Sequence, residues 1–433
     1  MRSVTLGVLG ILAALGSGCD DGSSGGGPVK VGLLAPKTGA LMQVGESFER
    51  VAQTAVKSIN DLGGINGRDL ELIVEDTQTV ADTAGGKLQG LIDQGVIAVV
   101  GPATSGEVTN AFPVARDAKV PIISPSSTAP GLSRPAPTGP DDKGFMFRNV
   151  PDDDIQGLAI AYYIKNLRMP TVGTAAVMFE DTPYGQGLKN AFKTAFEDVG
   201  GTVTLEVNFP QNLANAAAAT TQIDKLVSAS PQPAFVVLIA LEQDAVKLVT
   251  AWDNGGSPRI ANMQWFMTDG ARSSGFLTAV PTSIRGMCGT APTFPIQGLA
   301  YQRLSEEYEK AFTDKIGDQV FAPNVWDGFH LIAAAMVHQA KNFPNEDLGG
   351  DHLRDAITTI SRDGQTFHAA QWRDLVSSLL AGNDVDYDGA AGPNDLDVVG
   401  QAIGPYEVWC ISAQGAFTQA LFLKAEDIQK LRP

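Results

Sequence analysis

The chain has 433 residues, of which 44% are hydrophobic and 18% charged. This balance is ordinary for a globular protein of two or three domains, each able to bury a core. The formal net charge of -17 argues against nucleic-acid binding, because phosphate contacts depend on Lys and Arg.

The N-terminus has the features of an export signal. Arg2 precedes an apolar run over residues 4–15, and three small residues then lead to Cys19. The run is too short to cross a bilayer, which takes about 20 residues, so residues 1–19 are expected to be a signal peptide. Cys19 is placed as in a bacterial lipoprotein signal, where the Cys is lipidated, although Gly16 stands where Leu is usual; plain cleavage is the alternative. Residues 20–28, DDGSSGGGP, are typical of a flexible tether.

Strand and helix patterns alternate from Val29 onward. Residues 29–36 predict a strand, and strands are also expected at 70–75, 96–101 and 120–124. Between the first two strands, one apolar helix face is formed by Phe48, Val51, Ala52, Ala55 and Ile59. Such alternation predicts a mostly parallel sheet that is covered by helices on both faces.

Two of these strands end in small hydroxyl residues. They are VIAVVGPATSG at 96–106 and VPIISPSSTAP at 120–130, with a helical stretch between them. Because the carboxyl ends of parallel strands face the ligand crevice, the hydroxyl residues Thr104, Ser105, Ser126, Ser127 and Thr128 are expected to converge. Hydroxyls and the free N–H groups of a helix start suit a carboxylate.

A second series of elements follows a Pro/Gly-rich interruption at 130–144. Strands are expected at 145–150, 172–179, 203–209, 234–240 and 264–268, then helices at 302–315, 323–341, 348–360 and 372–380, and a last strand at 406–411. The pattern predicts an α/β fold of two doubly wound parallel-sheet lobes. A cleft between two such lobes suits a small ligand.

Enzyme and metal signatures are weak, so neither catalysis nor a metal or other cofactor is expected. A GxSxG match at 22–26 lies in the tether, where no strand and helix can form a nucleophile elbow. The four His residues are scattered over the C-terminal helices. A calcium-loop match at Asp384, Asp386, Asp388, Gly389 and Asp395 lacks the usual final Glu, and Gly392 and Pro393 interrupt it, so a structural loop is favoured.

The whole pattern then resembles the type I periplasmic solute-binding proteins of the branched-chain amino acid ABC transporter family (leucine/isoleucine/valine-binding protein-like), in lipoprotein form. The motifs that carry the resemblance are, in chain order, KVGLLAPKTG, AVKSINDLGGINGRDLELIVEDTQT, VVGPATSG, VPIISPSSTAP, FMFRNVPDDD, DTPYGQGLKNAF and VWDGFHLIAAA. The calcium-like segment also resembles a Y-x-G-x-x-G...D segment of this family, at Tyr387, Gly389, Gly392 and Asp397.

The resemblance implies an amino acid ligand that is held by both of its charged groups. Ser105 and Thr128 would meet the carboxylate, and the carbonyl of Ser126 would accept from the ammonium group. Tyr184 corresponds to a second-lobe Tyr that closes over the ligand, and Asp269 falls where the family usually has a Glu that pairs with the ammonium group. From the residues alone, Ser105, Thr128 and Asp269 have an alternative interpretation as helix caps, and Tyr184 as a packed aromatic.

The expected periphery of the pocket departs from the family pattern. It comprises Val44, Ala103, Thr104 and Leu241. The family has aromatic residues near the positions of Val44 and of Ala240 or Leu241. The amino-acid headgroup is therefore predicted, but leucine as the ligand is not.

The resemblance also implies a three-strand hinge, with strands at 145–150, 285–290 and 406–411. The first lobe would take 29–149 plus about 288–385, and the second lobe 150–287 plus about 400–433. Cys288 and Cys410 are the only cysteines after Cys19, and spacing alone leaves a disulfide and two free thiols open. On neighbouring hinge strands, about 5 Å apart, a disulfide is favoured.

These observations predict an exported, periplasmic and membrane-anchored receptor, not an enzyme. It would bind a small amino acid or related compound and deliver it to the permease of an ABC importer. The alternative is a sensor of the same fold, without a transport role, for amides, urea or small carboxylates.

Overall fold

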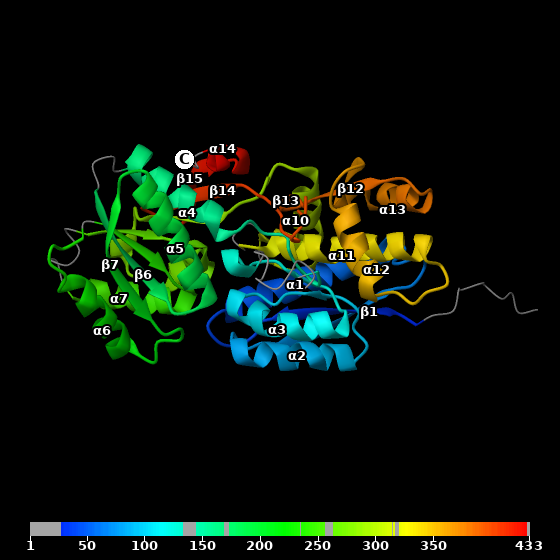
Figure 1. The fold of residues 1–433 in the computed structure, drawn as a ribbon, viewed down its shortest axis with the longest axis horizontal. Coiled ribbons are helices and arrows are strands. Elements are labelled where there is room, and N and C mark those ends of the chain that lie inside the picture. Colours follow the sequence, from blue (N-terminus) through cyan, green and yellow to red (C-terminus); the bar gives the residue numbers. More distant parts are fainter. Residues whose placement is uncertain are drawn as a thin grey trace, which may run out of the picture.

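The computed structural model describes residues 27–132, 144–168, 173–233, 235–255, 263–313, 315–316 and 320–430. The predicted signal peptide, Cys19 and most of the tether lie outside these residues. The described chain forms two α/β lobes that lie side by side along the long axis of the molecule (Figure 1). This confirms the predicted two-lobed parallel-sheet architecture. None of its described helices combines the length and the apolar character that a membrane span requires.

The first lobe is built on a five-stranded parallel sheet of order β2-β1-β3-β4-β5. The strands are β1 (Val29–Ala35), β2 (Leu70–Asp76), β3 (Val99–Val100), β4 (Ile122–Ser124) and β5 (Met146–Arg148). The helices α1 (Met42–Asp61), α2 (Ala81–Asp93) and α3 (Ser105–Ala118) alternate with the first four strands. The five residues predicted to form one apolar face of α1 are all fully buried.

A later part of the chain completes the first lobe. It supplies α10 (Leu299–Ala311), α11 (Ala322–Asn342), α12 (Gly350–Ile360) and α13 (Trp372–Leu380). Most of α11 is buried, because its Ala, Val, Ile and Leu residues leave no polar face over most of its length. The blue and yellow-to-orange segments therefore lie together in Figure 1 although they are far apart in sequence.

The second lobe has a seven-stranded sheet of order β15-β14-β10-β9-β8-β6-β7. Its strands are β6 (Thr174–Glu180), β7 (Thr202–Phe209), β8 (Phe235–Ile239), β9 (Gln264–Met267), β10 (Cys288–Pro292), β14 (Tyr406–Ile411) and β15 (Phe417–Leu423). Helices α4 (Asp153–Tyr162), α5 (Pro183–Asp198), α6 (Ala216–Val227), α7 (Glu242–Asn254), α9 (Ser274–Ala279) and α14 (Ala425–Gln429) surround it. Strand β14 runs antiparallel to both of its neighbours.

The predicted hinge strands differ from the observed ones. Strand β10 pairs with β9 and β14 inside the second sheet, so the chain returns to the first lobe after Pro292 and not at residue 288. The lobes are instead joined by segments 149–152, 293–298 and 394–405. The position of the crossing differs because β10 pairs with β9 and β14, so it is buried along its whole length inside the sheet of the second lobe.

Several short strands were not predicted. They include β11 (Gln365–His368), β12 (Val385–Gly389) and β13 (Gly392–Pro393), which form a small separate sheet in the first lobe. The calcium-like segment is therefore mainly strand β12, with Val385, Tyr387 and Gly389 buried and the aspartates between them more exposed. No cluster of three or more His, Cys, Asp or Glu suited to a metal occurs within the described ranges.

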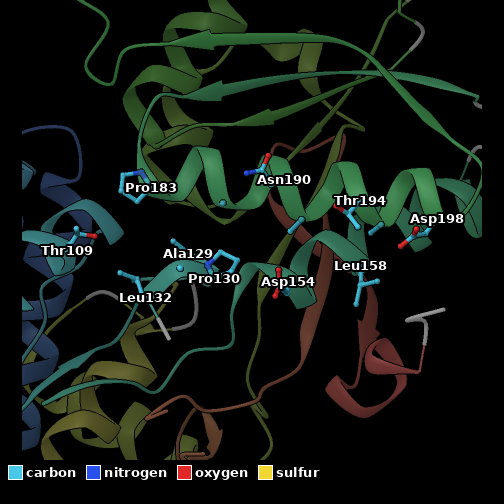
Figure 2. A pocket seen from close by; sticks show the side chains of 14 residues that line it. Thr109, Ala129, Pro130, Leu132, Asp154, Leu158, Pro183, Asn190, Thr194 and Asp198 are labelled. Atoms are coloured by element: carbon cyan, nitrogen blue, oxygen red, sulfur yellow. The ribbon is translucent and has the colours of Figure 1, made fainter. Parts of the chain in front are cut away.

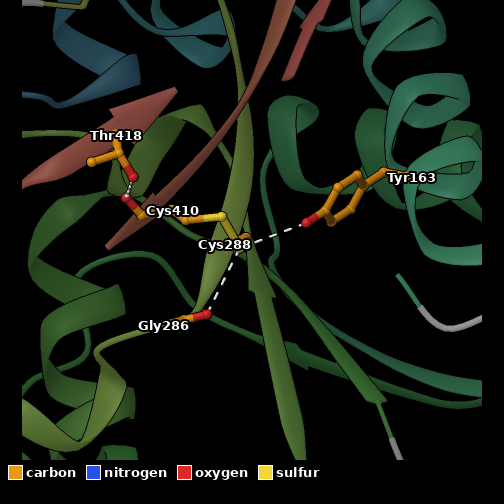
Figure 3. Close-up of a disulfide and its surroundings, with 5 residues drawn as sticks. All are labelled: Tyr163, Gly286, Cys288, Cys410 and Thr418. Carbon is orange, nitrogen blue, oxygen red and sulfur yellow. Dashed lines mark hydrogen bonds between the residues drawn. A yellow bond between two sulfur atoms is a disulfide. The ribbon is translucent and has the colours of Figure 1, made fainter. Parts of the chain in front are cut away.

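Cys288 and Cys410 stand directly opposite each other on β10 and β14 and form a disulfide (Figure 3). The Tyr163 hydroxyl lies 3.9 Å from the sulfur of Cys288. The disulfide joins residues that are 122 positions apart in sequence. It links β10, which precedes the crossing segment 293–298, to β14, which follows the crossing segment 394–405.

Candidate functional site

The start of α3 forms one wall of the candidate site. The hydroxyl of Thr104 accepts from the N–H of Glu107 at 3.3 Å, and the Glu107 carboxylate accepts from the N–H of Thr104 at 2.8 Å. This capping box fixes the first turn of the helix. The N–H groups of Ser105 and Gly106 lie within that turn, where no intrahelical acceptor exists. The turn therefore offers donors to an anion.

Serine hydroxyls join the two predicted hydroxyl-rich loops. Ser126 Oγ donates to the carbonyl of Ala103 at 2.7 Å, and Ser127 Oγ donates to the same carbonyl at 3.1 Å. The N–H of Ala129 donates to Ser105 Oγ at 3.2 Å. Because Ser105 Oγ accepts this bond, its own proton remains available to a ligand carboxylate.

The opposite wall comes from the second lobe and is acidic. Asp269 follows β9, and its Oδ1 accepts from Gln156 Nε2 at 2.8 Å and from the Tyr184 hydroxyl at 3.0 Å. Tyr184 also lies 2.9 Å from Thr268 Oγ1. Burial raises the pKa of Asp269 to about 6, although the hydrogen bonds from Gln156 and Tyr184 oppose this shift.

A second buried carboxylate, Asp153, belongs to the same acidic region. It is fully buried at the start of α4, and its N–H donates to the carbonyl of Thr128 at 2.9 Å. Burial, followed by repulsion from Asp269, raises the pKa of Asp153 well above its usual range. Asp153 was not predicted as a site residue because it lies among three consecutive aspartates, of which Asp152 is the helix cap.

The two walls enclose a cavity of about 260 Å³ between the lobes. The predicted residues that line it are Ser105, Ser126, Tyr184, Asp269, Val44, Ala103, Thr104 and Leu241. Thr128, which was predicted to meet the ligand carboxylate, does not line the cavity. The residue is buried, with an exposed fraction of 1%. Lining residues that the sequence analysis missed include Leu41, Ala81, Asp181, Gln211, Arg272 and Phe321.

The missed lining residues follow from the order of the strands. In the first lobe, the cavity is lined by residues that follow three neighbouring strands: Leu41 after β1, Ser105 after β3 and Ser126 after β4. In the second lobe it passes from Asp269 after β9 to Leu241 after β8. One end of the cavity is therefore polar and charged, and an apolar region lies beside it. Knowledge of the strand order, which the sequence did not provide, would have located these positions.

Arg272 lines the cavity, but its charge is already paired. Its guanidinium forms an ion pair with the buried Glu407 on β14 at 2.5 Å, and it also lies over the ring of Phe417, 5.1 Å from the centroid. The side chain is 14% exposed. The candidate donors for an anion at this cavity are therefore the N–H groups at the start of α3.

A larger hollow of about 800 Å³ lies outside this cavity (Figure 2). Asn190, Thr194 and Asp198 of α5 form one side, and Pro130, Leu132, Asp154 and Leu158 form the other. It shares only Pro183 with the interlobe cavity. It contains none of the hydroxyl and acidic residues described above, so the smaller cavity is the candidate ligand site.

Two α/β lobes around a cavity that is polar at one end and apolar beside it are typical of solute-binding proteins. The periplasmic binding protein family matches residues 28–402, so the chain belongs to that family. This confirms, at the level of that family, the resemblance to periplasmic solute-binding proteins that the sequence motifs indicated.

Two relatives match most of the chain. The chain is 29% identical over 338 residues to the uncharacterized protein MJ1266 of Methanocaldococcus jannaschii, covering 77% of this chain and 78% of that protein. It is 24% identical over 403 residues to the chemotactic signal transduction substrate-binding protein BasB of Halobacterium salinarum, covering 92% and 90%.

A solved structure has the same fold. This is the branched-chain amino acid transporter substrate binding protein LivJ of Streptococcus pneumoniae in complex with isoleucine. It superimposes with a TM-score of 0.72 at 21% identity, covering 92% of this chain and 99% of LivJ.

Proposed function

We propose that this protein is an exported receptor that traps a small α-amino acid between its lobes and delivers it to an ABC importer. The observation that carries the proposal is the pairing of two opposite chemistries in one enclosed cavity. Ser105 and the first turn of α3 offer donors to a carboxylate, while Asp269 offers a buried acceptor to an ammonium group. A buried zwitterion needs both charges compensated, because an unpaired buried charge costs several kcal/mol.

The walls next to the charged end favour a small or medium side chain. Leu41, Val44, Leu241 and Phe321 are apolar and line the same cavity. Its volume of about 260 Å³ lies just below the roughly 300–1,000 Å³ of drug-sized sites, which favours a ligand of amino-acid size. Asp153 adds a second buried carboxyl group behind the ammonium end, and Thr128 supports that wall through its carbonyl.

Transport is supported by the N-terminal sequence and by the family. A signal peptide ending at Cys19 and a tether at 20–28 would hold the receptor at the membrane, beside a permease. Closure of two lobes about a hinge is a known way to trap a ligand. No bond is made or broken in this function.

A sensor function is the alternative, and the likeness to BasB favours it. A sensor would use the same ligand site but would pass its closed state to a signalling partner. Neighbouring genes for permease and ATPase subunits would support transport, whereas a neighbouring kinase or chemotaxis receptor would support sensing.

A thermal-shift screen against amino acids and organic acids tests the proposed ligand class. A ligand at a hundred times its dissociation constant adds roughly 2.7 kcal/mol to the free energy of unfolding. For the best amino acid, we expect Asp269→Ala to weaken binding at least tenfold, about 1.4 kcal/mol, in calorimetry. If Asp269→Ala leaves the affinity unchanged while Ser105→Ala abolishes binding, the ligand is a simple carboxylate and the amino-acid assignment is wrong.

A further inference from the structure

Arg148, the last residue of β5, is completely buried, but it does not line the ligand cavity. A buried guanidinium is costly unless several acceptors surround it. The positions of those acceptors therefore indicate what the residue does. They fall into two groups. One lies on the loop after β4, residues 125–132, which we call the headgroup loop. The other lies on the crossing segments 149–152 and 394–405, which we call the hinge.

The first group of acceptors lies on the loop that follows β4. Arg148 Nη1 donates to the carbonyls of Ser127 at 3.2 Å and Ala129 at 2.9 Å. The carbonyl between them, that of Thr128, accepts from the N–H of Asp153. Three successive carbonyls are thus held in place. The same loop carries Ser126 and bonds to Ser105, so its conformation sets the positions of the groups that face the ligand.

The second group of acceptors lies on the segments that cross between the lobes. Arg148 Nη2 donates to Gln401 Oε1 at 2.5 Å and lies 3.5 Å from Asp152 Oδ2. Gln401 Nε2 donates to the same carboxylate oxygen at 3.1 Å. The backbone of Arg148 also bonds to Gly400 and Ala402. Asp152 itself caps α4, the first helix of the second lobe.

We propose that Arg148 is a positioning residue that couples the headgroup loop of the first lobe to the hinge. Its fork-shaped guanidinium reaches loop carbonyls with one nitrogen and hinge acceptors with the other, which the single ammonium group of Lys cannot do. A change in the crossing segments 149–152 and 394–405 therefore changes the loop that binds the ligand. The part of the inference that concerns ligand binding rests on the proposed function.

The coupling is testable without a ligand, through Gln401→Leu. Gln401 bonds to Arg148 and to Asp152, both at the segments that cross between the lobes. Hydrogen exchange of the free protein should therefore become at least tenfold faster over residues 124–132 in this variant. The matched control is Gln339→Leu, which removes a buried amide that bonds to Asp347 and Gly349 elsewhere in the first lobe. Unchanged exchange over 124–132 in Gln401→Leu would overturn the coupling.

Ligand affinity then separates this proposal from the proposed function. With an amino acid that binds the wild type, Gln401→Leu and Arg148→Lys should each raise the Kd at least fivefold, and Gln339→Leu should not. If the wild type binds an amino acid and both variants bind it equally well, the positioning role is wrong. If the wild type binds no amino acid, the proposed function fails, while the exchange experiment still decides the coupling.

Discussion

The two carboxylate oxygens of Asp269 have different environments. Oδ1 accepts from the side chains of Gln156 and Tyr184, whereas neither of these side chains donates to Oδ2. The side chain lines the cavity and is 7% exposed. Oδ2 is therefore the oxygen that we expect to accept from a ligand ammonium group.

Ligand binding should consequently depend on pH. Because the pKa of Asp269 is about 6 in the free protein, the carboxylate is ionised at neutral pH and becomes protonated as the pH falls. Only the ionised form compensates an ammonium group, so the Kd should be level above about pH 6 and rise about tenfold per pH unit below it. Calorimetry between about pH 8 and pH 5 checks this. A level Kd across that range would contradict the role of Asp269, and Asp269→Asn should bind weakly even at the upper end of the range.

At the scale of residues, sequence motifs located residues that line one cavity but not the residues that support them. Ser105, Ser126, Tyr184 and Asp269 stand in recognisable motifs and do line one cavity. Arg148 could not be recognised in the same way. Its role depends on Gln401, which lies 253 positions away.

Among the elements, α11 and the small β12–β13 sheet are joined by one buried carboxylate. Asp327 Oδ1 accepts from the Ala390 N–H at 2.7 Å and from the Tyr387 hydroxyl at 3.0 Å, and Oδ2 accepts from the Ala391 N–H at 2.8 Å. A Cβ on Gly389 would lie 2.2 Å from Asp327 Oδ2, so only Gly permits this approach. Two motifs that lie far apart in sequence, VWDGFH and YDGAAG, thus meet at Asp327.

We expect Asp327→Asn to lower the free energy of unfolding by about 1–3 kcal/mol, because the amide presents a donor to backbone N–H groups. Denaturant unfolding measures this change. Asp374→Asn, at an exposed carboxylate on α13, should stay within about 0.5 kcal/mol of the wild type. Equal stability of the two variants would mean that Asp327 does not hold the sheet on α11.

Length helped to decide which elements could be predicted from sequence, although the seven-residue strand β15 was not predicted. Helices α1, α11 and α13 have enough turns for their apolar pattern to be clear, and their predicted positions agree with the structure. Strands β11 and β13 have four and two residues, too few for a clear alternation. The boundary at β10 was misplaced because pairing partners, which a single sequence does not reveal, assign that strand to the second sheet.

At the scale of the whole molecule, the lobes contact each other around the cavity. Gln243 Nε2 of the second lobe donates to the carbonyl of Gly39 in the first lobe at 3.2 Å. Gly275 of α9 packs at the same boundary, where an added Cβ would lie 2.5 Å from Gln43 Oε1 of the first lobe. The structure thus describes lobes that are closed upon each other.

A larger side chain at Gly275 should hinder this closure. We expect Gly275→Val to raise the Kd at least tenfold, and small-angle scattering should show a larger radius of gyration than for the wild type at saturating ligand. The control is Gly90→Val on α2, where an added Cβ meets nothing within 4 Å. If Gly275→Val binds and compacts like the wild type, closure at this boundary is not needed for binding.

The central claim is that the cavity recognises both charged groups of an amino acid. Its most direct test is calorimetry with the best-binding amino acid, the same molecule without its amino group, and the same molecule without its carboxyl group. The account predicts that the amino acid binds and that each analogue binds at least a hundredfold more weakly, about 2.7 kcal/mol. A deaminated analogue that binds as tightly as the amino acid would contradict it.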